Sequence, residues 1–88
     1  MIKNELFRQC LNAIPEEQKQ EFELSFGIAE RISEVLKSKN LTQKDFAHQL
    51  NKRESEISKW LTGRHNFTMQ TIAKIETALG CKLISIVQ

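Results

Sequence analysis

The 88-residue chain has few of the residues that break or cross-link a polypeptide. It contains three glycines, one proline, two cysteines and no tyrosine. So little glycine and proline excludes collagen-like and linker-rich chains. The two cysteines, Cys10 and Cys81, are too few and too far apart for a metal cluster, and one pair makes an improbable disulfide framework in a cytosolic protein. We interpret them as two small buried thiols.

Long apolar runs are also missing. No window approaches the roughly 18 consecutive apolar residues that a membrane span needs. The first residues, with Lys3, Glu5 and Arg8 among them, do not resemble the apolar stretch of a signal peptide. A chain with 40% hydrophobic and 27% charged residues has the composition of a globular protein. We therefore expect one compact core, no membrane contact and a cytoplasmic location.

Charge is unevenly distributed along the chain, although the net charge is only +2. Residues 1–36 hold four basic and seven acidic residues, whereas residues 37–74 hold eight basic and three acidic ones. A basic middle of this kind suggests a surface that meets an anion. Taken alone, the pattern is weak evidence, because lysine-rich stretches are usually solvated faces.

The first forty residues predict two helices. Apolar residues recur at helical spacing over residues 2 to 13. Pro15, followed by Glu16 and Glu17, suits the first turn of a second helix that reaches about Lys39, and Gly27 makes a break or bend there possible. The apolar side of this second helix is expected to carry Phe22, Phe26, Ala29, Ile32 or Ser33, and Leu36.

A tight succession of start and stop signals predicts two short helices next. Thr42 and Asp45 have the spacing of a capping box, which starts a helix at Gln43. Asn51 tolerates the left-handed conformation of a tight turn and ends it. The following helix runs from about residue 54 to 62 and is closed by Gly63. The inner faces are expected to carry Phe46, Ala47, Leu50, Ile57, Trp60 and Leu61.

The end of the chain predicts one more helix and a strand. Thr68 is a good N-cap, and Gly80 ends the helix that follows it. Residues 82–88 are rich in β-branched side chains and predict a short strand. The inner face of the helix is expected to carry Ile72, Ile75, Ala78 and Leu79.

The two short helices, separated by about three residues, have the spacing of a helix-turn-helix. With Ile57, Trp60 and Leu61 pointing inward, the second helix keeps one polar stripe exposed. Its members, at helical spacing, are Ser55, Ser58, Lys59 and Thr62. Such a stripe suits a helix that lies in a major groove, where short hydroxyls allow close approach and a lysine reaches a guanine edge or a phosphate.

Residues 41–80, LTQKDFAHQLNKRESEISKWLTGRHNFTMQTIAKIETALG, resemble the Cro/CI (Xre) class of helix-turn-helix DNA-binding domains. The Leu-Thr-Gln opening, Phe46-Ala47, Ile57-Ser58, Gly63 and the closing Ala-Leu-Gly match its pattern in register. The resemblance implies an all-α, lambda-repressor-like helical bundle. The expected parts are an N-terminal helical extension over residues 1–26, the helix-turn-helix domain over residues 27–80, and a C-terminal β-strand over residues 81–88.

The resemblance also implies which residues contact DNA. The positions that would read base edges are Glu54, Ser55, Ser58, Lys59 and Thr62. The positions that would contact the sugar-phosphate backbone are Gln43, Lys44, Lys52, Arg53, Arg64, His65 and Asn66. The chain departs from the family at Arg53, which replaces the usual helix cap, and at Phe67, which indicates extra apolar packing under the loop. Glu54 could accept a hydrogen bond from a cytosine amine or simply balance the helix dipole.

A lone exposed strand invites pairing. Pairing with the same strand of a second copy would give the two-fold homodimer that palindromic operators require. The residues expected in this contact are Leu83, Ile84, Ser85, Ile86 and Val87. Small proteins of this build, with an added N-terminal segment, also resemble antitoxins of type II toxin–antitoxin systems.

Two functional hypotheses follow from these observations. The first is a sequence-specific repressor that binds double-stranded DNA as a homodimer. The alternative is an antitoxin that neutralises a partner toxin and regulates its own operon. The acidic N-terminal segment has three possible roles: packing on the domain, supporting the dimer, or binding another protein.

Catalytic, metal and cofactor roles are not expected. His48 and His65 have no Cys, Asp or His at ligand spacing on a shared face, and we interpret them as a surface helix residue and a loop contact. Trp60 could stack on a base, but its place between two inward apolar residues favours the core. Ser58 lacks the adjacent base that a nucleophile needs. An enzyme is therefore the weakest hypothesis.

Overall fold

The computed structural model describes residues 13–87. The helix expected over residues 2 to 13 therefore lies, except for its last residue, outside the described part. Four helices follow in the described residues: α2 (Glu16–Ser38), α3 (Gln43–Gln49), α4 (Glu54–Trp60) and α5 (Met69–Leu79). No described helix is long and apolar enough to cross a membrane. The expected all-α helical bundle is thus confirmed for this part of the chain.

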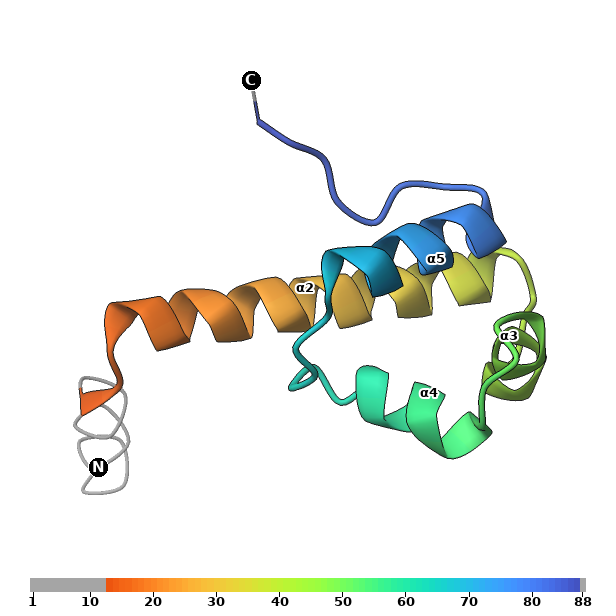
Figure 1. The fold of residues 1–88 in the computed structure, drawn as a ribbon, viewed down its shortest axis with the longest axis horizontal. Coiled ribbons are helices and arrows are strands. Elements are labelled where there is room, and N and C mark those ends of the chain that lie inside the picture. The colour runs from red at the N-terminus through yellow and green to blue at the C-terminus, as the bar shows by residue number, and fades with distance from the viewer. Residues whose placement is uncertain (1–12, 88) are drawn as a thin grey trace.

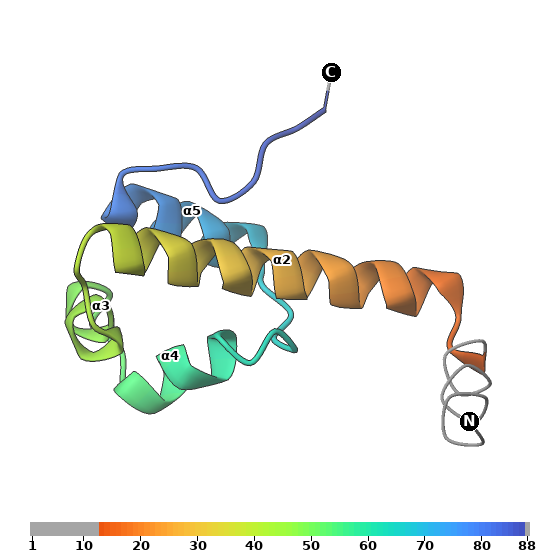
Figure 2. The same cartoon turned by 180° about the vertical axis from the view of Figure 1, so that it is seen from behind.

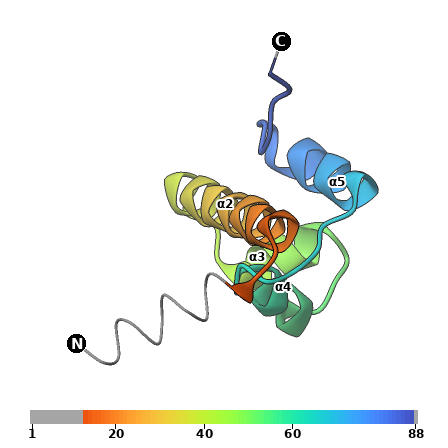
Figure 3. The same ribbon diagram turned by 90° about the vertical axis from the view of Figure 1, so that its left-hand side faces the viewer.

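The long helix α2 is the axis of the molecule. Its second half packs with the other helices, and its first half extends beyond them (Figures 1 and 2). Seen from the end, α5 lies on one side of α2, and α3 and α4 lie on another (Figure 3). The short helices are therefore presented on a face of their own, away from α5.

Local sequence signals position the helix ends as expected. The side-chain oxygen of Thr42 accepts a hydrogen bond from the Asp45 N–H at 3.0 Å, and the Asp45 carboxylate accepts one from the Thr42 N–H at 3.1 Å, which completes the capping box of α3. Asn51 adopts a positive φ of 56° in the turn before α4. Arg53, at the N-cap of α4, makes no side-chain cap, in agreement with the expected departure from the family.

Helices α2 and α5 also begin or end at the residues expected from the sequence. Pro15 stands at the N-cap of α2, which continues through Gly27 without the break that glycine allows. This helix is continuous across residues 26 and 27, where the expected N-terminal extension meets the expected helix-turn-helix domain. The position of this domain boundary stays a prediction. Thr68 caps α5 by accepting from the Thr71 N–H at 3.1 Å, and Gly80 ends it with a φ of 69°.

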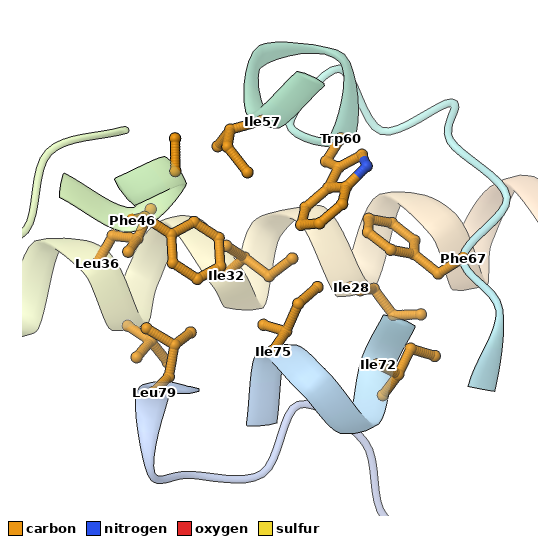
Figure 4. Packing of buried hydrophobic residues seen from close by; sticks show 12 residues of the cluster. Ile28, Ile32, Leu36, Phe46, Ile57, Trp60, Phe67, Ile72, Ile75 and Leu79 are labelled. Carbon is orange, nitrogen blue, oxygen red and sulfur yellow. The ribbon is translucent and has the colours of Figure 1, made fainter. Parts of the chain in front are cut away.

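The core lies where the helices converge, as Figure 4 shows. Phe46 from α3 and Ile32 from α2 are fully buried beside Ile57 of α4 and Ile75 of α5. Trp60 exposes only 6% of its surface, which confirms its core position. Leu50 and Leu61 are partly buried against this cluster. Ala78, which we expected inside, is exposed, because the buried stripe of α5 passes through Ile72, Ile75 and Leu79.

One expectation for α2 is wrong in its first half. Ala29, Ile32 and Leu36 are buried as expected, but Phe22 and Phe26 remain 45% and 59% exposed. The physical reason is the shape of the bundle. The first half of α2, which carries both phenylalanines, extends past α4 and α5 (Figure 1).

The expected C-terminal strand is not present in residues 81–87. A strand needs a neighbouring strand to accept and donate its backbone hydrogen bonds. Here the N–H groups of Leu83 and Ile84 donate instead to the carboxylate of Glu76, at 2.8 and 3.3 Å. The side chain of Arg31 donates to the carbonyl of Lys82 at 3.2 Å. The segment is thus held on the bundle by side chains.

The cysteine expectation holds only in part. Cys81 is half-buried rather than buried, and it packs beside the core at the start of the C-terminal segment. Cys10 lies outside the described residues.

Candidate nucleic-acid interface

Helices α3 and α4 and the three-residue turn between Leu50 and Glu54 form the helix-turn-helix unit. A tight turn is possible because Asn51 takes the left-handed conformation there and the Lys52 N–H donates to the carbonyl of Ala47 at 2.9 Å. Phe46 of α3, and Ile57 and Trp60 of α4, are buried in the core and hold both helices on it. The outer surface of the unit is left to polar and basic side chains.

The residues expected to read bases are all exposed. Ser55, Ser58 and Lys59 lie on α4 itself, and Glu54 is its first residue. Thr62 differs, because α4 ends at Trp60 and Thr62 lies in the turn after it. Its hydroxyl donates to the carbonyl of Lys59 at 2.7 Å and accepts from the Arg64 N–H at 3.3 Å. Thr62 therefore shapes the turn that follows α4.

A hydrogen bond connects the two sets of expected DNA contacts. The Ser58 hydroxyl on α4 donates to the side-chain oxygen of Gln43, the first residue of α3, at 2.9 Å. Gln43 was expected at the DNA backbone and Ser58 at the bases. The fold thus brings the start of α3 and the exposed stripe of α4 together on one surface, across fifteen residues of sequence.

The basic residues beside this stripe are also exposed. Lys44 and Arg53 face solvent, and neither makes an ion pair within 4.0 Å in the described part of the chain. Lys52 forms an ion pair with Glu56 at 3.7 Å, one turn along α4. An exposed pair of this kind contributes little to stability, so Lys52 can exchange Glu56 for a phosphate at small cost.

The loop after α4 has a buried and an open side. Phe67 is buried, and its ring packs edge-on against Trp60 at 5.9 Å, which confirms the apolar packing expected under the loop. The His65 ring lies 4.8 Å from the Phe67 ring and 5.9 Å from that of Trp60, so His65 is half-buried. Arg64 and Asn66 stay exposed. His48, on α3, is a surface residue, as expected.

A shallow hollow of about 400 Å³ lies between α4 and this loop. Four of the expected DNA contacts, Lys52, Lys59, His65 and Asn66, are among its lining residues. The residues from the turn, from α4 and from the loop are therefore neighbours in space. The geometry groups side chains that the sequence places up to fourteen positions apart.

In the described part of the chain, two carboxylates have lowered pKa values, and both serve the fold. The backbone N–H of Thr42 lowers the pKa of Asp45, with a smaller contribution from the Thr42 side chain. The backbone N–H of Leu83, followed by that of Ile84, lowers the pKa of Glu76. Within residues 13–87, no group of three His, Cys, Asp or Glu side chains is arranged to hold a metal ion.

Sequence reasoning missed two features. One is the anchoring of the C-terminal segment by Glu76 and Arg31, for which a lone acidic residue in α5 gives no local signal. The other is the pair of exposed rings, Phe22 and Phe26. For Phe26 a usable signal was present, because Glu23 and Glu30 lie three and four residues from it on the same face of the helix, and a face with carboxylates beside its apolar residue is poorly suited to a core.

Two short helices joined by a tight turn, with the second exposing a polar and basic stripe, define a helix-turn-helix module. The chain belongs to the helix-turn-helix family, whose model matches residues 24–86. The resemblance to the Cro/CI type of this family is thereby confirmed, and it extends from the first half of α2 into the C-terminal segment.

The chain is also similar to three eukaryotic proteins. It is 35% identical over 60 residues to multiprotein-bridging factor 1 of Debaryomyces hansenii. The aligned stretch covers 68% of this chain and 40% of that protein. Endothelial differentiation-related factor 1 of Homo sapiens matches with the same identity and coverage. Multiprotein-bridging factor 1 of Candida albicans is 35% identical over 57 residues. The chain thus spans about two fifths of the length of these relatives.

Proposed function

We propose that the protein is a sequence-specific transcriptional repressor that binds double-stranded DNA as a homodimer, with α4 in the major groove. The observation that supports this most directly is the Gln43–Ser58 hydrogen bond. It joins the start of α3 to the exposed stripe of α4, so that one approach of the DNA engages both. The basic residues on and beside α3 and α4 are all exposed and supply the attraction to phosphates; they are Lys44, Lys52, Arg53, Lys59 and Arg64.

The two sets of side chains have different tasks in this proposal. Specificity rests on Ser55, Ser58 and Lys59, with Glu54 at the edge of the stripe and Thr62 holding the turn. Affinity rests on the backbone contacts, which carry no sequence information of their own. They are Gln43, Lys44, Lys52, Arg53, Arg64, His65 and Asn66.

Dimerisation is assigned to the C-terminal segment in this proposal. Leu83 and Ile84 are half-buried against the core, whereas Ile86 and Val87 are 85% and 94% exposed. Apolar side chains this exposed, next to a segment already held in place, favour contact with a second copy. A two-fold dimer presents two α4 helices to a symmetric operator. The cytoplasmic location and the absence of enzymatic activity stay part of the same proposal.

A protein partner is the second role that an observation favours. The first half of α2 is acidic and exposes two aromatic rings, so a partner toxin, as in the antitoxin hypothesis, is compatible with the DNA-binding role. Two of the similar proteins are called multiprotein-bridging factor 1, and this name also favours a protein partner.

Selection of binding sites from a random duplex DNA library tests the proposal. We expect one enriched motif with two related half-sites, bound about a thousandfold or more tightly than random DNA. Lys59→Glu on α4 should abolish this enrichment. Lys74→Glu, which reverses the same charge at an exposed position of α5, should preserve it. If no motif is enriched, or if both variants behave alike, α4 is not a recognition helix.

A further inference from the structure

An open groove of about 840 Å³ lies between the first half of α2 and the turn that follows α4. Its apolar part consists of Phe22 and Phe26, one turn apart on α2, with Gly63 opposite them. Glu23 and Glu30 line it from α2, and Arg64 lines it from the turn. The groove is distinct from the smaller hollow beside α4, but two of the expected DNA contacts, Thr62 and Arg64, line its far side.

The groove is preformed rather than a chance exposure of flexible side chains. A Cβ atom at Gly63 would lie 2.6 Å from Cδ2 of Phe26, so this ring rests directly on the backbone of the turn. Gly63 also has a φ of 84°, a conformation that glycine adopts without strain. The ring of Phe26 is therefore held in place while 59% of the residue remains exposed.

Charge decides what kind of occupant fits. Glu23 and Glu30 lie two helical turns apart, on the same face of α2. The first half of α2 also carries Glu16, Glu17 and Glu21 against a single basic residue, Lys19. These carboxylates repel the phosphates of a nucleic acid, so the α2 side of the groove does not suit DNA.

Symmetry argues against a second copy as the occupant. A two-fold contact places the same patch on both partners. If two grooves faced each other, four glutamates would be gathered against only two arginines, and this excess of negative charge in a desolvated contact is unfavourable. The complementary occupant has basic groups beside apolar ones.

We propose that the groove is the docking site for a basic amphipathic helix of a partner protein. Two apolar side chains of that helix, one turn apart, insert between Phe22 and Phe26, and lysines or arginines on its flanks pair with Glu23 and Glu30. Binding of an amphipathic helix in an apolar groove, anchored at i and i+4, is a recurrent mode of peptide recognition. Burial of the two rings supplies the affinity, and the carboxylates select for positive charge.

A direct test titrates the ¹⁵N-labelled full-length protein with a synthetic 14-residue amphipathic peptide of leucine and lysine, followed by amide chemical shifts. We expect saturable shifts at residues 22, 26, 30 and 63. A peptide in which glutamate replaces every lysine should produce none of them. The spectrum of each variant also reports whether that variant is folded, so loss of binding is separable from loss of structure.

Three variants make the test specific. Phe22→Ser should lower the affinity for the peptide about tenfold, the value expected when one aromatic ring no longer packs on the peptide. The double reversal Glu23→Lys with Glu30→Lys should lower it by at least as much. Leu24→Ser is the matched control, because Leu24 is 57% exposed on the same helix but does not line the groove. It should change the affinity less than twofold.

Other outcomes overturn the proposal. Equal losses for Phe22→Ser and Leu24→Ser would show general hydrophobic adhesion to α2. Nuclear Overhauser contacts between residues 1–12 and the two phenylalanine rings in the free protein would assign the groove to the chain's own N-terminal segment. A dimer that dissociates on Phe22→Ser would assign it to a second copy. None of these results depends on whether the protein binds DNA.

Discussion

Lys59 is the single residue on which the proposed sequence specificity depends most. It is exposed on α4, one turn after Ser55, and it lines the hollow shared with the loop. We expect Lys59→Ala to weaken binding to the selected operator by about 1 to 3 kcal/mol and to relax the preference at one base position. Fluorescence anisotropy with the operator and its single-base variants measures both effects. Equal losses on operator and random DNA would make Lys59 a phosphate contact.

Arg64 tests the other class of contact. It is exposed in the loop after α4, and the buried Phe67 anchors this loop on the core. We expect Arg64→Ala to weaken binding to all DNA sequences equally. The slope of log affinity against log salt concentration should fall by about 0.9, because the variant neutralises one phosphate fewer. An unchanged slope would remove Arg64 from the interface.

At the scale of elements, the turn after α4 depends on one glycine. Gly63→Ala would place a Cβ atom 2.6 Å from the Phe26 ring and force a side chain into a φ of 84°. We expect it to lower the free energy of unfolding by about 2 to 3 kcal/mol in urea denaturation.

Gly27→Ala is the matched control for this turn. Gly27 lies within α2, and a Cβ atom there would meet nothing within 4 Å. It should raise the free energy of unfolding by about 0.5 to 1 kcal/mol, because alanine restricts the unfolded chain. Similar effects of the two substitutions would contradict the close contact between Phe26 and the turn.

The capping box of α3 makes stability depend on acid. The pKa of Asp45 is lower in the folded protein than in the unfolded chain, mainly because the Thr42 N–H donates to its carboxylate. The unfolded state therefore binds a proton more readily, and the contribution of Asp45 is complete above its ordinary pKa and is lost as the pH falls below it. Urea denaturation between pH 6 and about pH 3 should show a shallower decline for Asp45→Asn than for the wild type. Identical declines would refute this role.

The elements that could be predicted from the sequence are those that depend on contacts between neighbouring residues. The capping box of Thr42 and Asp45, the left-handed Asn51 and Gly80 at the end of α5 involve residues close together in the chain, and all appear as expected. The end of α4 does not, because the helix stops at Trp60, and Gly63 lies in the turn that follows. The buried face of α2 depends on where the bundle ends, which no local pattern records, so Phe22 and Phe26 were placed inside.

The C-terminal segment shows the same limit more clearly. Its β-branched residues suit a strand, but a strand forms only beside another. In the described part of the chain, the carboxylate of Glu76 accepts hydrogen bonds from the N–H groups of Leu83 and Ile84 instead. The side chain of Arg31 donates one to the carbonyl of Lys82. Of the candidate interface, the exposure of the stripe could be predicted, whereas the Gln43–Ser58 contact required the fold.

At the scale of the whole molecule, charge separates two surfaces. Five basic residues lie on or beside α3 and α4, namely Lys44, Lys52, Arg53, Lys59 and Arg64. Four glutamates, Glu16, Glu17, Glu21 and Glu23, lie on the first half of α2, beside the apolar groove. Arg64 stands at the border, because it lines the groove and belongs to the loop expected on DNA. A partner in the groove would thus lie next to the DNA surface without covering α4.

The last prediction concerns the dimer. Ile86→Ser combined with Val87→Ser removes only exposed apolar surface and leaves Leu83 and Ile84 on the core, so the fold should persist. We expect sedimentation equilibrium to show monomers, because these side chains form the proposed contact between copies. Operator binding should weaken by about a hundredfold or more, since each half-site is then bound on its own.

Leu24→Ser serves as the control, because it removes an apolar side chain of comparable exposure from α2 and should leave the dimer intact. If the double variant still sediments as a dimer, the two-fold contact lies elsewhere on the molecule. The C-terminal segment would then be an appendage that Glu76 holds on the bundle, and half-site spacing on the operator would be set by another surface.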